Sequence, residues 1–201
     1  MEQKVTKEEA DRLMAIPGNV RGEVLLTNGE YIRQLGGEEK LKQTEERMKE
    51  LGHPLLFKNI KQMEHYPEAL SVLLTLLARE LLNLDEEGVF KMGKAAAKLS
   101  FFMKVLTKYF VSIKRSFEES PRYWQKHFDF GRIEIVDFSE EKKYGTFRVI
   151  GYKFHPIMCI YHRGYFMQIA QLILGRRSVR IEETKCQFKG DPYHEYVVHW
   201  V

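Results

Sequence analysis

The spacing of hydrophobic residues changes once along this chain, and that change limits the folds open to it. Up to about residue 128, hydrophobic residues recur every three or four positions, the spacing that gives a helix one buried face. From residue 129 they alternate with polar residues, as Ile133 and Ile135 do, which is the period of a half-buried strand. One apolar helical segment, residues 156–174, interrupts this second part. The sequence therefore predicts an α+β fold, in which a helical N-terminal half packs on a four-stranded antiparallel sheet with β-β-α-β-β connectivity.

Capping signals and glycines divide the first part of the chain. Thr6 followed by Glu9 forms a capping box, which predicts a short helix at the N-terminus. The pairs Asn28-Gly29 and Gly36-Gly37 are interpreted as breaks, with a charged helix over residues 38–51 after them.

Two strongly apolar helices are predicted next, over residues 67–82 and 86–114. Because the first is hydrophobic nearly all round, we expect it at the centre of the helical core. Ser120 and Pro121 suit an N-cap and a first helical position, so they predict a further short helix that ends near residue 128.

Length and composition suit one ordinary domain. The chain has 201 residues, of which 44% are hydrophobic, enough for a core of its own. We therefore expect a single domain over residues 1–201, mainly helical at 1–128 and a sheet with one covering helix at 129–201. No apolar run approaches the ~20 residues that span a bilayer, and the N-terminal segment is charged. We expect no membrane span and a cytoplasmic location.

Two function classes fit the sequence poorly. Lys91, Lys94 and Lys98 share one helical face, but Glu86 and Glu87 flank them, which favours a solvated helix over a nucleic-acid interface. The sequence also has no glycine-rich phosphate loop, no Gly-x-Ser-x-Gly elbow and no His-Glu-x-x-His motif. We expect neither nucleic-acid binding nor enzymatic activity.

The stretch ETKCQFKGDPYHEYVVHW predicts a closing hairpin with Cys186 on one strand and His194 on the other. A loop of two or four residues places these side chains on opposite faces of the sheet. A loop of three or five residues, or a bulge at Gly190, places them on one face. The alternation leaves both arrangements open, although the parity of hydrophobic positions changes between Ile181 and Cys186, as a bulge would cause.

This C-terminal region, with RGYFMQIAQLILG before VRIEETKCQFKGDPYHEYVV, resembles the 4-vinyl reductase domain. That domain ends in an acidic residue, a Cys, a Gly-containing turn and a second Cys eight positions after the first. Cys186 matches the first cysteine, Gly190-Asp191 matches the turn, and His194 stands where the second cysteine is expected. The stretch VRGEVLLTNGEYIRQLGGEE is similar to the start of the heme-binding H-NOX domains, which share a superfamily with 4-vinyl reductase domains and TRAPP vesicle-tethering subunits.

The resemblance makes heme the first cofactor to consider. H-NOX domains hold the iron with a His on a long helix and the propionates with a Tyr-x-Ser-x-Arg motif. Here no His lies between His65 and His127, and the counterpart of the second motif, DFSEE, has Asp137 and Glu141 in place of Tyr and Arg. Acidic side chains there would repel carboxylates. We therefore predict that this protein binds no heme.

Zinc is the second cofactor that the resemblance implies. Phenol-sensing members of the 4-vinyl reductase type hold a zinc ion against the terminal hairpin with cysteines and a Glu. The candidate ligands carried over by position are Cys186, His194, His155 and Glu134, all of types suited to a tetrahedral site. The alternative is a buried cysteine and an exposed histidine with no metal.

The function implied by the resemblance is a non-enzymatic sensory or adaptor domain that binds a small apolar or aromatic ligand. We expect it to act as a homodimer, in agreement with the apolar surface of the central helices, and to signal through an unidentified partner protein. Two alternatives stay open: a structural assembly protein with a filled core, and a zinc-stabilised variant of the same fold. The candidate pocket residues are apolar side chains on the helices at 86–114 and 156–174, namely Phe101, Phe102, Val105, Tyr109, Tyr161, Tyr165 and Phe166.

Overall fold

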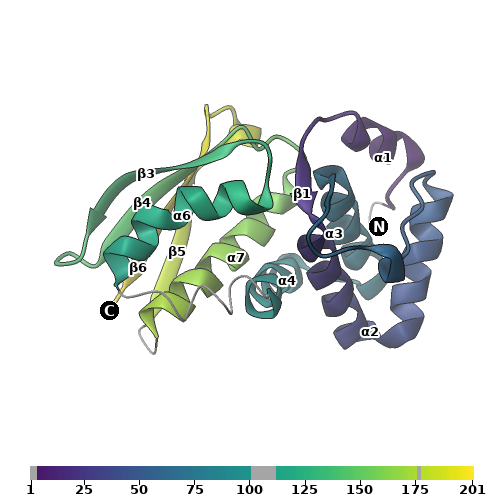
Figure 1. Cartoon of the computed structure of the whole chain (residues 1–201), viewed down its shortest axis with the longest axis horizontal. Coiled ribbons are helices and arrows are strands. Elements are labelled where there is room, and N and C mark those ends of the chain that lie inside the picture. Colours follow the sequence, from purple (N-terminus) through teal and green to yellow (C-terminus); the bar gives the residue numbers. More distant parts are fainter. Residues whose placement is uncertain (1–3, 101–111, 176–177) are drawn as a thin grey trace.

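The computed structural model describes residues 4–100, 112–175 and 178–201 and has the predicted α+β architecture. A sheet with two covering helices lies at one end of the molecule and a group of helices at the other (Figure 1). The helical end consists of α1 (Lys7–Met14), α2 (Gly22–Glu50) and α3 (Glu68–Leu82), and α4 (Glu86–Leu99) lies between the two ends. The helix α3 is buried along most of its length, as its all-round hydrophobicity predicts.

The C-terminal sheet is antiparallel throughout, and its strands are ordered β3-β4-β6-β5. A hairpin of β3 (Arg132–Ser139) and β4 (Tyr144–Ile150) precedes α7 (Ile157–Leu174), and β5 (Val179–Lys185) and β6 (His194–Trp200) follow it. The predicted β-β-α-β-β connectivity is confirmed. A short two-stranded sheet, which the hydrophobic pattern does not predict, pairs β1 (Asn19–Arg21), just before α2, with β2 (His65–Pro67), just before α3.

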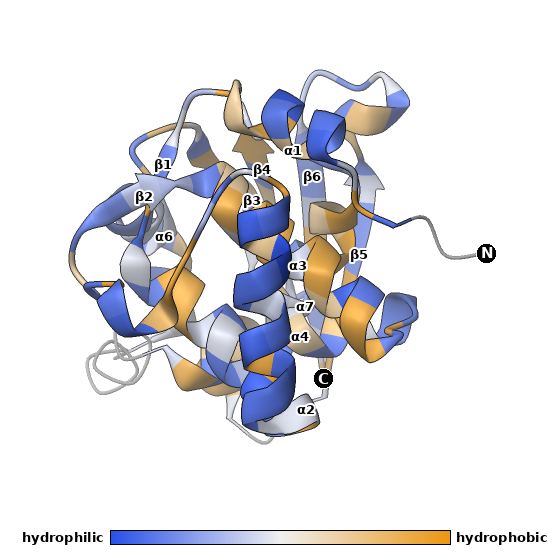
Figure 2. Cartoon of the chain, turned by 90° about the vertical axis from the view of Figure 1, so that its right-hand side faces the viewer, coloured by the Kyte–Doolittle hydropathy of each residue, from blue (hydrophilic) through white to orange (hydrophobic). Residues whose placement is uncertain are grey.

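Seen from the helical end, hydrophilic residues lie mostly on the outward-facing surfaces of the helices (Figure 2). None of the helices in residues 4–100, 112–175 and 178–201 is long and apolar enough to cross a membrane.

Two glycines allow α4 and α7 to cross with their backbones in contact. A Cβ atom added at Gly93 would lie 1.9 Å from the Tyr161 carbonyl oxygen, and one added at Gly164 would lie 2.0 Å from the Phe90 carbonyl oxygen. Both are far inside van der Waals contact, and the obstructing atoms belong to backbone. Because α7 covers the sheet and α4 adjoins the helical end, this crossing joins the two ends of the molecule.

The Asn28-Gly29 pair lies inside α2, so its prediction as a break is wrong. Gly29 is needed there because the ring of Phe57 occupies the space of a side chain, with its Cε1 2.3 Å from the ideal Cβ position. Asn28 is fully buried, and its Oδ1 accepts a hydrogen bond of 2.8 Å from the Tyr161 hydroxyl. The break predicted at Gly36-Gly37 is real, since Gly37 has a φ of 72° and kinks α2.

The helix predicted to start at Ser120 starts earlier, as α6 (Ile113–His127) with Ser112 as its N-cap. Pro121 therefore lies inside the helix, where it cannot donate to the carbonyl of Phe117 four residues back. The Ser120 hydroxyl donates to that carbonyl instead, at 2.8 Å. This replacement explains why the Ser-Pro pair does not mark a helix start. The long helix predicted over residues 86–114 ends at Leu99 in α4, and residues 101–111 lie outside the described part of the chain.

Replacing Gly164 with Ala should lower the free energy of unfolding by at least about 2 kcal/mol, since neither backbone at the crossing can yield without separating the helices. In an open helix the same change stabilises by roughly 1 kcal/mol, so the sign of the effect is diagnostic. Urea unfolding of Gly164→Ala and Gly93→Ala, with the exposed α4 variant Lys98→Ala as control, measures it. A gain in stability for either glycine variant would contradict the backbone contact.

Candidate functional site

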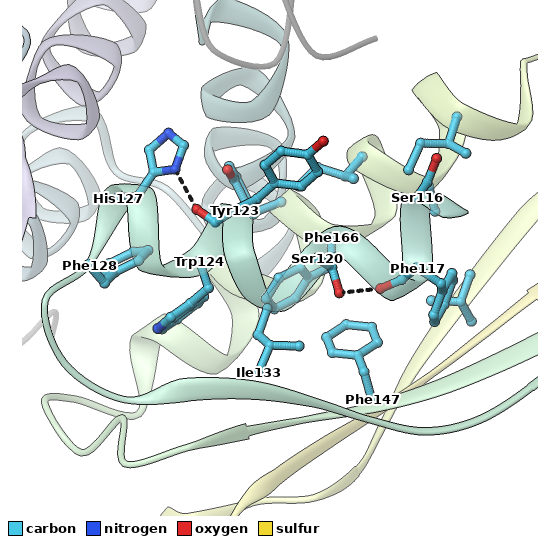
Figure 3. A pocket seen from close by; sticks show the side chains of 15 residues that line it. Ser116, Phe117, Ser120, Tyr123, Trp124, His127, Phe128, Ile133, Phe147 and Phe166 are labelled. Atoms are coloured by element: carbon cyan, nitrogen blue, oxygen red, sulfur yellow. Dashed lines mark hydrogen bonds between the residues drawn. The ribbon is translucent and has the colours of Figure 1, made fainter. Parts of the chain in front are cut away.

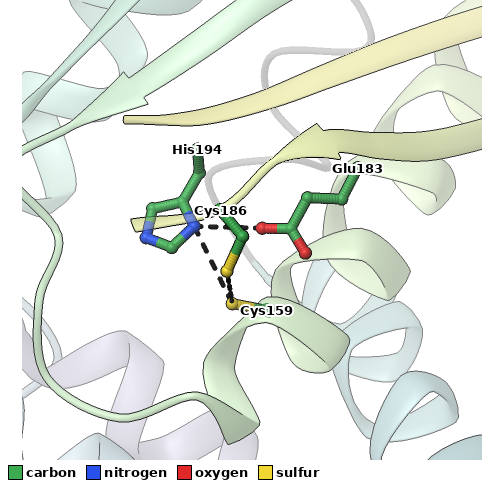
Figure 4. Close-up of side chains that lie close together, drawn as sticks. All are labelled: Cys159, Glu183, Cys186 and His194. Carbon is green, nitrogen blue, oxygen red and sulfur yellow. Dashed lines mark hydrogen bonds and ion pairs between the residues drawn. The ribbon is translucent and has the colours of Figure 1, made fainter. Parts of the chain in front are cut away.

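Four potential metal ligands meet where α7 lies against the β5–β6 end of the sheet (Figure 4). Cys159 comes from the first turn of α7, Glu183 from β5, Cys186 from the residue after β5, and His194 from the first residue of β6. One ligand atom from each lies within 4.8 Å of the other three. The Cys159 and Cys186 sulfurs are 3.5 Å apart, Cys159 Sγ lies 3.8 Å from His194 Nδ1, and that nitrogen lies 3.0 Å from Glu183 Oε1. We call these residues the Cys-Glu-Cys-His cluster.

A bulge in β5 brings Glu183 and Cys186 to the same face. Glu183 is paired with Tyr196, whereas Lys185 is paired with Glu195, so Thr184 is the extra residue. The Thr184 hydroxyl donates to Glu195 Oε1 at 3.0 Å on the opposite side. The bulge thus turns Cys186 towards α7 beside Glu183, where an unbroken strand would turn it away.

The segment between Cys186 and His194 is not a tight hairpin loop. It contains a 3₁₀ turn (Gln187–Lys189) that ends at Gly190, whose φ is 97°. Asp191 Oδ2 accepts a hydrogen bond of 2.8 Å from the Cys186 backbone nitrogen and closes the turn. The predicted bulge exists, but it lies at Thr184 and not at Gly190, and Cys186 and His194 share one face.

The hydrogen bonds of His194 direct one ring nitrogen at the cluster. His194 is buried, and its Nε2 lies 3.0 Å from the backbone carbonyl oxygen of Tyr152. A carbonyl only accepts, so Nε2 carries a proton, and Nδ1 is the ring nitrogen that faces Cys159 and Glu183, where a bound cation would take its lone pair. A backbone carbonyl that fixes the tautomer in this way is the usual second partner of a metal-bound histidine.

The donor set and its spacing fit a tetrahedral zinc ion. With Zn–S bonds of about 2.3 Å and Zn–N bonds of about 2.0 Å, tetrahedral ligands lie roughly 3.3–3.8 Å from one another. The three separations given above lie close to that range. Burial, with the Glu183 carboxylate as the next cause, raises the pKa of the Cys159 thiol. A cation bound at the centre of the cluster would lower this pKa again, because its positive charge stabilises a thiolate beside a carboxylate.

Two of the four residues proposed as ligands from sequence alone lie outside the cluster. His155 precedes α7, and its Nε2 lies 3.6 Å from Glu9 Oε1. Glu134 is on β3 and accepts a hydrogen bond of 2.8 Å from Arg132 Nε. Cys159 and Glu183 take their places. The side chains of Glu183 and Cys186 share one face only because of the bulge at Thr184, and the sequence pattern does not locate that bulge.

An apolar cavity of about 100 Å³ lies between α6, α7 and the sheet, beyond the cluster along α7 (Figure 3). Its walls are almost wholly hydrocarbon, and Ile133, Phe147 and Phe166 project into it from β3, β4 and α7. Of the proposed pocket residues, Tyr165 and Phe166 line this cavity, and Phe101, Phe102, Val105 and Tyr109 lie outside the described residues. The described residues that line it are Ser116, Phe117, Ser120, Tyr123, Trp124, His127, Phe128, Ile133, Phe147, Tyr165, Phe166, Ile169, Ala170, Ile173 and Val198.

A second, smaller cavity of about 30 Å³ adjoins the first and has more polar residues in its lining, although most of its wall is hydrocarbon as well. It contains the buried carboxyl groups of Glu23 and Glu68, together with His162 and the proposed pocket residue Tyr161. Burial raises the pKa of Glu68 to about 8, although a hydrogen bond from Tyr152 opposes the shift. Burial also lowers the pKa of His162 to about 3, so its imidazole is neutral at pH 7. We call this space the polar cavity.

The sequence matches no protein-family model and no curated protein. The structure, however, is similar to solved H-NOX proteins. An H-NOX protein from S. oneidensis in the Fe(II)NO ligation state has a TM-score of 0.69 and 12% identity, over 90% of this chain and 99% of that one. An oxygen-binding H-NOX domain related to soluble guanylate cyclases has a TM-score of 0.62 and 13% identity, over 90% of this chain and 94% of that one. The chain therefore has an H-NOX-like fold.

Proposed function

We propose that this protein is a non-enzymatic sensory domain that binds a small apolar or aromatic molecule and is held together by a zinc ion. The observation that carries the proposal is that one helix serves both sites. The first turn of α7 supplies Cys159 to the Cys-Glu-Cys-His cluster, and residues further along α7 line the apolar cavity. Zinc at the cluster would fix the start of α7 against β5 and β6, and so fix one wall of the cavity.

Zinc in this position would be structural. The cluster offers four protein ligands, which leaves no open position for water or substrate. The three side chains beside Cys159 are all positioned by the closing hairpin, so the metal would clamp that hairpin to α7. A closed site of this kind agrees with the absence of catalytic motifs in the sequence.

The apolar cavity supports a small ligand. Its volume of about 100 Å³ is of the order of that of engineered cavities that take up benzene-sized molecules. A filled core, which the structural-assembly alternative requires, does not agree with an opening of this size. We keep the homodimer, the unidentified partner protein and the cytoplasmic location as parts of the proposal.

Heme fits the described residues poorly. Although the structural neighbours include Fe(II) H-NOX proteins, the cavity here is well below the ~300–1,000 Å³ of pockets that hold drug-sized ligands. The described linings of the two cavities contain no Lys or Arg that could hold propionates, and the polar cavity contains two carboxyl groups. We propose a heme-free protein.

Protein purified without added metal should contain about one zinc per chain. The His194→Ala variant should lose it, together with about 10 °C of Tm, because loss of a structural metal costs on the order of 3 kcal/mol or more and each kcal/mol shifts Tm by roughly 2–4 °C. His199→Ala is the matched control, since His199 lies on the same strand but is exposed on the other face. Elemental analysis and thermal unfolding measure both effects. Metal far below one equivalent in the wild type would end the zinc proposal.

Toluene should bind in the apolar cavity and shift the NMR signals of residues around it. The variant Ile173→Phe should weaken binding at least tenfold, because the added ring occupies the cavity. Leu172→Phe is the control, since the neighbouring Leu172 is exposed on the outside of α7. Equal affinities for the two variants, or no binding to the wild type, would contradict the ligand proposal.

The absorbance spectrum of the purified protein should lack a Soret band, and added hemin should bind without a defined stoichiometry. Both follow from the size and the acidic lining of the two cavities. A Soret band that co-purifies with the chain at one equivalent would show that the heme prediction is wrong.

A further inference from the structure

We propose that the ligand is a primary amine, with its ammonium group in the polar cavity beside Glu68 and its apolar body in the neighbouring apolar cavity. This inference rests on the proposed small-molecule binding and specifies the chemical class of the ligand. It is carried by an unpartnered buried oxygen, by the aromatic walls around it and by the position of the two cavities.

The unpartnered oxygen is Oε2 of Glu68, the first residue of α3. Glu68 is only 1% exposed, and its Oε1 accepts a hydrogen bond from the Tyr152 hydroxyl. Oε2 has no hydrogen-bond partner, although it is completely buried and Glu68 lines the polar cavity. A buried polar atom without a partner costs about 1–3 kcal/mol, and for the ionised carboxylate a ligand that donates a hydrogen bond to Oε2 removes this cost.

The surroundings of this oxygen favour a positively charged donor. Glu23 is a second buried acid in the same cavity, with its Oε1 at 2.9 Å from the Ser100 hydroxyl and its Oε2 at 3.7 Å from His127 Nε2. Trp124, Phe128, Tyr161 and Tyr165 also line the polar cavity, and aromatic faces attract cations. Among the described residues, no Lys or Arg lines it, so an anionic head group would meet only acids, aromatic rings and neutral groups.

The polar cavity is large enough for an ammonium head group. Its volume of about 30 Å³ exceeds the roughly 10–15 Å³ that one water molecule needs. Trp124, His127, Phe128 and Tyr165 line both cavities, which therefore lie side by side, and the proposed ligand places its apolar body in the larger one and its head group beside Glu68.

The proposal predicts a pH dependence with a definite sign. Tyr152, before α7, donates to Glu68, and the other described titratable groups that line the same cavity are Glu23 on α2, His127 on α6, and Tyr161, His162 and Tyr165 on α7. Below about pH 8 the Glu68 carboxyl is neutral in the free protein, and an ammonium ion must displace its proton. Affinity for the amine should therefore rise with pH, by up to about tenfold per unit, and level off above about pH 8. Aliphatic amines titrate near pH 10, so the ligand keeps its charge over this range.

Benzylamine, benzyl alcohol and benzoate test the head group, because they have nearly the same size and differ in charge. Calorimetric titration at about pH 8 should show benzylamine binding at least tenfold more tightly than benzyl alcohol, with benzoate the weakest, and only benzylamine should lose affinity towards about pH 6. Equal affinities for the amine and the alcohol, or a tighter carboxylate, would overturn the amine proposal and leave ligand binding intact. If toluene and all three compounds fail to bind, the proposed function fails as well.

The variant Glu68→Gln tests whether Glu68 is the residue that binds the ammonium group. It keeps the side-chain shape and an oxygen for the Tyr152 hydroxyl, but it cannot pair with a cation. It should reduce benzylamine affinity at least tenfold, remove its pH dependence and leave benzyl alcohol within about twofold. Glu64→Gln, a change at an exposed glutamate four residues earlier, is the matched control and should behave like the wild type. An unchanged benzylamine affinity in Glu68→Gln would overturn the proposal, and the comparison of ligands on the wild-type protein decides it without any variant.

Discussion

The direct contact between the backbones of α4 and α7 is the constraint on which the rest of the structure depends. Gly93 and Gly164 each face a carbonyl of the opposite helix at a distance that no side chain allows. The contact sets the position of α7, which in turn carries Cys159 at its start and the wall of the apolar cavity along its length. It also brings Tyr161 within reach of Asn28 on α2, which ties the sheet end to the helical end by a buried hydrogen bond.

The closing hairpin depends on α7 in a different way. Its strands are held by the sheet ladder, and the turn region between Cys186 and His194 is fixed by its own hydrogen bonds, by Arg148 of β4 over the Tyr193 ring and by the cluster. A cluster of two thiols, a carboxylate and an imidazole is a poor stabiliser without a cation, since burial and the Glu183 carboxylate raise the pKa of the Cys159 thiol. With a metal, the same groups become the strongest link between the hairpin and the helix.

The fold class and the strand connectivity could be predicted because they follow from hydrophobic period alone. The errors arose where a side chain or a backbone contact overrode a local signal. Asn28-Gly29 is typical of a turn, but the buried side chain of Asn28 and the ring of Phe57 against Gly29 make this pair a packing site inside α2. Pro121 reads as a helix start, but the Ser120 hydroxyl satisfies the carbonyl that the proline leaves open. In the cluster, Cys186 and His194 were candidate ligands from the sequence, but whether they share a face stayed open, and the position of Glu183 depended on a one-residue bulge that alternation suggests without locating.

Tyr152 connects the two sites through opposite ends of one residue. Its carbonyl oxygen accepts from His194 Nε2, and its hydroxyl donates to Glu68 Oε1 on a helix 84 positions earlier in the chain. A shift of this residue therefore changes the orientation of a cluster ligand and the environment of a buried carboxyl group together. By thermodynamic reciprocity, whatever free energy the occupancy of one site contributes to the affinity of the other must act equally in the reverse direction. Through this one tyrosine, two hydrogen bonds form a direct path between the closing hairpin and the helical core.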